Sequence, residues 1–115
     1  MTEQERKGLN QFVAKVRAYY GQRLHDVLLV GTRTRPDDPP FHDADVVVIL
    51  KVANTAAIGE LLRLADFGYD PLIETGLFIN PWLLSVSDLT STTDPDKVWI
   101  ADLARKHANS VLESA

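Results

Sequence analysis

The sequence predicts one α+β domain, spanning residues 1–115, in which helices pack on a small mixed β-sheet of about three core strands. Its apolar residues alternate between helical spacing and short continuous runs, in the order helix, strand, loop, strand, helix, strand, helix. The first two strands are too close in sequence for a crossover helix, so we expect antiparallel neighbours. The third strand follows a helix and is expected to run parallel to the second. The length and the 45% hydrophobic content fit a single small core.

The first half of the chain predicts one helix and two strands. A helix is expected over residues 3–20, where apolar residues recur at helical spacing. Thr2 and Glu5 form a capping-box pattern at its start, and Gly21 is suited to end it. Residues 26–31 predict a short buried strand. The next strand, 43–51, is almost entirely aliphatic after its first residues, so we expect it to be central and covered on both faces.

The second half predicts a helix, one further helical turn, a third strand and a last helix. The helix begins at Asn54 or Thr55 and runs to about Phe67, and the further turn ends at Gly76. Residues 77–86 predict the third strand, in which Pro81 indicates an edge position or a bulge. Residues 88–96 are expected to form a loop. The last helix, about 95–113, would present one apolar face, made of Val98, Ala101, Ala104, Ala108 and Val111.

Composition excludes several classes of protein. The net charge of −4 argues against a nucleic-acid binder, which usually carries a basic face. The absence of cysteine excludes disulfides and thiolate metal sites and fits a cytoplasmic location. The charged N-terminus lacks the apolar core of a signal peptide, and no apolar run is long enough to cross a bilayer. A domain this small leaves room for a second copy or a partner chain to complete a site.

Two carboxylates stand at the beginning of the second strand. Asp43 and Asp45 are two positions apart, and side chains in a strand alternate between faces with a period of two. Both should therefore point to the same side of the sheet. Two oxygen ligands so placed can hold a hard cation such as Mg²⁺.

Groups that bind anions follow the first strand. We expect a turn at Gly31 that offers backbone N–H groups, the hydroxyl of Thr32 and the guanidinium groups of Arg33 and Arg35. Surface pairing of the two arginines with Asp37 or Asp38 is the alternative. A phosphate-binding turn close to a metal-binding acid pair is typical of phosphoryl or nucleotidyl transfer.

The combined motif resembles a known family. Its parts are Gly31-Thr32, Arg33-Thr34-Arg35-Pro36 and His42-Asp43-Ala44-Asp45, with a twelve-residue step from Gly31 to Asp43. These features resemble the nucleotidyltransferase superfamily with the DNA polymerase beta-like palm, and more closely its minimal, MNT-type members. The resemblance is strongest over residues 9–51.

The resemblance implies a palm-like fold and Mg²⁺-dependent transfer of AMP from ATP to a hydroxyl group. Asp43 and Asp45 would bind the metal, and Gly31 and Thr32 would hold the β- and γ-phosphates. The arginines of the motif, residues 33 and 35, would neutralise phosphate charge or dock the acceptor. Several MNT-type proteins act as antitoxins that modify a helical HEPN-type toxin, so such a toxin is the partner that the resemblance implies.

The sequence also departs from the family pattern. Pro36 and His42 replace the usual Gly and Ser, and the third strand lacks the third carboxylate of active members. Asn80 could take its place as a neutral ligand, and Glu74 and Asp88 are the nearest acids. These departures leave a second hypothesis open, namely a catalytically degenerate domain that neutralises a partner protein by contact alone.

Overall fold

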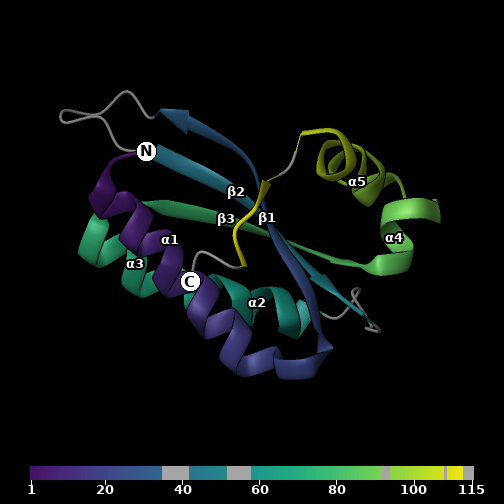
Figure 1. Ribbon diagram of the computed structural model, residues 1–115, viewed down its shortest axis with the longest axis horizontal. Helices are drawn as coiled ribbons and strands as arrows, with labels where there is room; N and C mark the ends of the chain where they lie inside the picture. The colour runs from purple at the N-terminus through teal and green to yellow at the C-terminus, as the bar shows by residue number, and fades with distance from the viewer. Residues whose placement is uncertain (35–41, 52–57, 92–93, 108, 113–115) are drawn as a thin grey trace.

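The computed structural model describes residues 1–34, 42–51, 58–91, 94–107 and 109–112 (Figure 1). Helices and strands alternate broadly as the sequence predicts. In chain order they are α1 (Glu3–Tyr20), the 3₁₀ turn η1 (Gly21–Arg23), β1 (Leu24–Thr34), β2 (His42–Leu50), α2 (Ile58–Phe67), α3 (Tyr69–Thr75), β3 (Phe78–Ser85), α4 (Val86–Ser91), α5 (Pro95–His107) and β4 (Asn109–Ser110). The expected start of α2 at Asn54 or Thr55 falls outside the described residues.

The four strands form one mixed sheet in the order β3-β2-β1-β4. β1 pairs antiparallel with β2 and with β4, and β2 pairs parallel with β3. This topology confirms the predicted α+β class, the antiparallel first pair and the parallel third strand. β3 is an edge strand, which is the first of the two alternatives that Pro81 indicated, an edge position or a bulge. The short β4 was not predicted.

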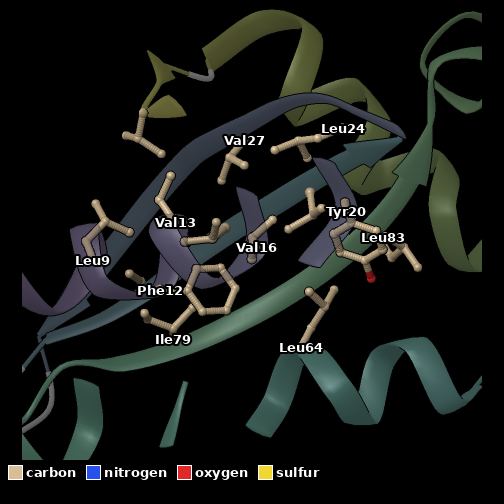
Figure 2. Close-up of a cluster of buried hydrophobic side chains, with 14 of the residues drawn as sticks. Leu9, Phe12, Val13, Val16, Tyr20, Leu24, Val27, Leu64, Ile79 and Leu83 are labelled. Carbon is tan, nitrogen blue, oxygen red and sulfur yellow. The ribbon is translucent and has the colours of Figure 1, made fainter. Parts of the chain in front are cut away.

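The sheet has helices on both faces, and the register of β2 defines which residues meet them (Figure 1). Ala44, Val46, Val48 and Leu50 belong to the larger core cluster, which contains the buried side of α1. Val47 and Ile49 belong to the smaller cluster with residues of α5. We call these the α1 face and the α5 face. Figure 2 shows the α1 face, where the side chains of Phe12, Val16 and others lie between the helices and the sheet.

The ends of α1 are fixed by the residues that the sequence singled out. Thr2 and Glu5 form the reciprocal capping box, with N···O distances of 2.9 Å and 3.1 Å. Gly21 ends the helix at φ 55°, a backbone conformation that glycine adopts without steric cost. Glu5 also accepts hydrogen bonds from the backbone and ring nitrogens of His42, at 3.0 Å and 2.8 Å. The N-terminus of α1 is thereby tied to the first residue of β2.

Two expectations for the C-terminal third were wrong. Residues 88–91, which were expected to begin a loop over 88–96, belong instead to α4, because Ser85 and Asp88 each accept a hydrogen bond from the other's backbone N–H. The last helix ends at His107, and the chain then pairs Asn109 and Ser110 with β1. Val98, which was expected on the inner face of this helix, is exposed. Ala108 lies outside the described residues.

Among the described helices, none has both the length and the apolar character that crossing a bilayer requires.

Candidate functional site

Asp43 and Asp45 lie on the same face of the sheet, the α5 face. Asp43 is paired with Arg33 of β1 and with Phe78 of β3, and Asp45 is paired with Gly31 and Asn80. Paired residues of neighbouring strands project to the same side of a sheet. The register therefore gathers two carboxylates, a guanidinium and an amide on one patch, which lies N-terminal along β2 to the two residues, Val47 and Ile49, that pack with α5.

Asp45 is held by two of these neighbours. Its Oδ1 atom accepts a hydrogen bond from Arg33 Nη2 at 3.2 Å and from Asn80 Nδ2 at 3.0 Å. The Arg33 side chain is 64% exposed and that of Asp45 is 22% exposed, so solvent screens the ion pair. Such a pair contributes about 0–1 kcal/mol. Arg33 can therefore leave Asp45 for a stronger anionic partner at little cost.

The expected turn at Gly31 is not observed. Residues 31–34 continue β1 as far as Thr34, and a bulge between Leu29 and Gly31 shifts the register. A side chain placed on Gly31 would meet no atom within 4 Å, so there is open space above this residue, across the register from Asp45. The bulge and the missing side chain leave room for a ligand on the acid patch.

The register separates one predicted site residue from the others. Thr32 pairs with Ala44, whose side chain is buried in the core of the α1 face, so the Thr32 hydroxyl lies on the opposite side of the sheet from the acids. Arg35 lies outside the described residues. Of the predicted phosphate-binding residues, the structure thus brings Gly31 and Arg33 to the acid pair and does not bring Thr32 there.

Of the three candidates for the third ligand, only Asn80 lies beside the acids. Glu74 lies on α3 and accepts a hydrogen bond from Gln11 of α1, on the α1 face. Asp88 follows the far end of β3, where it binds Ser85 and Lys97. Within the described ranges there is no group of three or more His, Cys, Asp or Glu side chains that could hold a metal. The oxygen donors that the patch offers to a cation are therefore those of two carboxylates and one amide.

His42 faces away from the acid patch. It pairs with Glu5 on the α1 face, so it anchors β2 and does not extend the patch. Burial raises the pKa of Glu5, but the hydrogen bonds from Thr2 and His42 outweigh that effect and lower the pKa to about 2. The carboxylate is charged at neutral pH and fixes the strand residue next to Asp43.

Two tryptophans lie next along the α5 face. Trp82 follows Asn80 by two positions on β3, and its ring lies 4.8 Å from that of Trp99 in an edge-to-face arrangement. Trp82 packs against the smaller core cluster, whereas Trp99 is about half exposed. The pair borders the patch on the α5 side.

A groove at the outer edge of β3 was not predicted. It has a volume of about 340 Å³ and is lined by Ala65, Asp66, Gly68, Tyr69, Leu72, Phe78, Ile79, Asn80 and Pro81. Asn80 belongs both to this groove and to the acid patch. Sequence patterns could not reveal the groove, because it forms where the α2–α3 junction meets β3. The apolar residues near that junction give no sequence signal, because their exposure is known only from the structure.

Comparison with known proteins gives no match: no family model, no curated protein and no solved structure matches this chain.

Proposed function

We propose that this protein is a Mg²⁺-dependent nucleotidyltransferase with a polymerase beta palm-like fold, which transfers AMP from ATP to a hydroxyl group of a partner protein. One observation carries the proposal. Asp43 and Asp45 share one sheet face, with open space at Gly31 directly across from Asp45 and an exposed guanidinium beside it. This arrangement suits a site at which Asp43 and Asp45 would hold a divalent cation beside bound phosphates.

The residues present fit the metal. Two carboxylates and the amide oxygen of Asn80 are hard oxygen donors of the kind that Mg²⁺ prefers. When bound, Mg²⁺ supplies neutralisation of phosphate charge and polarisation of the attacked phosphorus. Asp43 and Asp45 would hold it, while Gly31 leaves space for the phosphates. Arg33, which is only weakly held by Asp45, would move to a phosphate oxygen.

The transfer has a simple balance of bonds. The acceptor oxygen forms a bond to the α-phosphorus, the bond from that phosphorus to pyrophosphate breaks, and the hydroxyl proton passes to a carboxylate or to water. The proposal supplies ATP as the co-reactant. A HEPN-type helical toxin is the class of acceptor that the motif implies, which would make this chain an antitoxin.

Calorimetry with ATP and Mg²⁺ tests the proposal. Asp43→Asn and Asp45→Asn each remove a ligand, so Mg²⁺-dependent ATP binding is expected to weaken by more than the roughly 10–100-fold typical of changes around a metal ligand. The matched control is Asp102→Asn on α5, an exposed aspartate paired with Arg105 and Lys106. It is expected to bind as the wild type does. Equal binding by all four proteins would refute the proposal.

Labelled-ATP transfer onto a co-expressed partner protein then tests the reaction itself. Label is expected on the partner with the wild type and Asp102→Asn, and not with either patch variant.

A degenerate binding module is the second candidate, and one observation favours it. Arg33 and Asn80 both occupy Oδ1 of Asp45, and no third acid among the described residues joins the patch. A domain of this kind would bind its partner equally well with or without both patch aspartates, and would transfer no label. The same pair of variants therefore distinguishes the two functions.

A further inference from the structure

Apolar side chains are unusually exposed around the groove at the edge of β3. In the described part of the chain, five of the eight exposed large apolar side chains lie between residues 61 and 78: Leu61, Leu62, Tyr69, Ile73 and Phe78. Tyr69 and Phe78 line the groove, and Ile73 lies one helical turn after Tyr69 on α3. We call Leu62, Tyr69, Ile73 and Phe78 the elbow surface, because they surround the junction of α2 and α3. A cluster of exposed apolar side chains beside a groove is typical of a binding site.

The groove and the elbow surface run along the side of the sheet that lacks a neighbouring strand. β3 is the edge strand, and α2 and α3 lie beside it (Figure 1). The groove offers about 340 Å³ next to exposed aromatic rings, which is suited to an inserted apolar side chain. Tyr69 and Ile73 are 63% and 66% exposed, so they are available to pack against a partner.

The charges around this surface are mainly acidic. Asp66 lines the groove, and no Lys or Arg among the described residues forms an ion pair with it. Asp70 and Glu74 lie on α3, where Asp70 binds Lys15 and Glu74 binds Gln11. A partner with basic residues would therefore be complementary. A second copy of this chain, with a net charge of −4, would present the same acids and be repelled.

The groove is adjacent to the acid patch. Phe78 and Asn80 line it, and they are the register partners of Asp43 and Asp45. Neighbouring strands are about 4.8 Å apart and β3 lies between, so a segment held at the outer edge of β3 lies two spacings, or about 10 Å, from the strand that carries the acids. Docking at this position would bring an acceptor hydroxyl group close to the patch.

We propose that the groove and the elbow surface dock an amphipathic segment of the acceptor protein, with apolar side chains that enter the groove and basic side chains that pair with Asp66. Docking follows from the surface itself, whereas the identity of the segment as part of the acceptor rests on the proposed function.

A synthetic leucine–lysine amphipathic peptide of about 18 residues, or five helical turns, is the probe. In NMR titration it is expected to shift the amide signals of residues 62–80 and to leave those of α5 unchanged. Tyr69→Ser and Ile73→Ser are expected to weaken its binding by about tenfold each. Asp66→Asn is expected to weaken binding about twofold and to reduce its salt dependence. Val98→Ser on α5 is the matched control, because this apolar residue is also exposed.

The proposal is overturned if the peptide binds all these variants equally or shifts α5 to the same extent. A leucine–glutamate peptide that binds equally well would overturn the charge argument. Concentration-dependent self-association mapped to residues 62–80 would replace the partner with a second copy.

Failure of this proposal is separable from failure of the proposed function. Peptide binding without Mg²⁺-dependent ATP binding would leave the groove as a docking site on a domain that is not a transferase. ATP binding without peptide binding at the groove would refute the docking proposal alone.

Discussion

The buried carboxylate of Glu5 makes the stability of this protein dependent on pH. Glu5 is 3% exposed, and it accepts hydrogen bonds from the backbone N–H of Thr2 and from both the backbone and the ring of His42. Replacing it in Glu5→Gln keeps the shape of the side chain and removes its charge. The variant therefore mimics the protonated carboxyl at every pH.

The contribution of the charged Glu5 side chain to the free energy of unfolding follows from its lowered pKa. Burial raises the pKa of Glu5, but the hydrogen bonds that its carboxylate accepts outweigh this effect and lower the pKa from 4.5 to about 2. Each pKa unit corresponds to about 1.4 kcal/mol, so the charged form contributes about 3 kcal/mol to the free energy of unfolding at neutral pH. Because the folded pKa is the lower one, this contribution is fully present above pH 4.5 and is lost as the pH falls towards 2. That is a large share of the about 5–15 kcal/mol expected for a small domain.

Urea unfolding at a series of pH values between 7 and about 2 measures the effect. The wild type is expected to exceed Glu5→Gln by about 3 kcal/mol at pH 7, and the difference is expected to shrink towards zero near pH 2. Glu3→Gln, an exposed acid in the same helical turn, is the control and should show little change. A wild-type–Glu5→Gln difference that stays constant with pH would refute the electrostatic account.

Two further predictions concern single positions. Gly8→Ala places a Cβ 2.4 Å from Thr75 Oγ1, whereas Gly59→Ala meets nothing within 4 Å. In urea unfolding, we expect Gly8→Ala to lower the free energy of unfolding by about 1 kcal/mol, because the clash outweighs the helix propensity of alanine. We expect Gly59→Ala to raise it by about 0.5–1 kcal/mol. Two changes of the same sign would contradict this reasoning. Asn80→Asp loses the hydrogen bond to Asp45 and adds a like charge. Without divalent cations, the melting temperature should fall, by an amount equivalent to about 1–2 kcal/mol. Added Mg²⁺ is expected to raise the melting temperature of Asn80→Asp by more than it raises that of the wild type. An equal rise in the two proteins would count against a cation site at the patch.

Much of the fold could be predicted because local and tertiary preferences agree. Thr2 with Glu5 and Gly21 mark both ends of α1, and Pro81 correctly indicated an edge strand. The prediction is wrong at residues 88–91, because the Ser and Thr residues that favour a loop there belong to α4. Their helix depends on the reciprocal capping of Ser85 and Asp88, a pattern as local as that of Thr2 and Glu5. The predicted end of the last helix was wrong for a different reason. The residues after His107 form β4, and β4 forms only through pairing with β1.

The candidate site was predictable only in part. Strand periodicity alone places Asp43 and Asp45 on one face, and the structure has them there. The same alternation places Thr32 on the face opposite the acids. That placement could be predicted only if β1 was known to continue through Gly31, whereas the sequence indicated a turn there. The bulge before Gly31 and the approach of Asn80 depend on pairing between strands, which no local pattern specifies.

The arrangement around Asp45 explains how two carboxylates persist side by side at the start of a mostly buried strand. Their mutual repulsion would disfavour the fold unless positive or donor groups offset it. Arg33 and Asn80 both donate to one oxygen of Asp45, so they stabilise the patch when no cation is present. Arg33 and Asn80 would respond differently to a bound ligand. Asn80 is fixed on β3 and would remain, whereas the exposed Arg33 side chain can exchange Asp45 for a phosphate. A patch built in this way is preformed, and on binding of the proposed ligands its charge would be rebalanced by the movement of a single side chain.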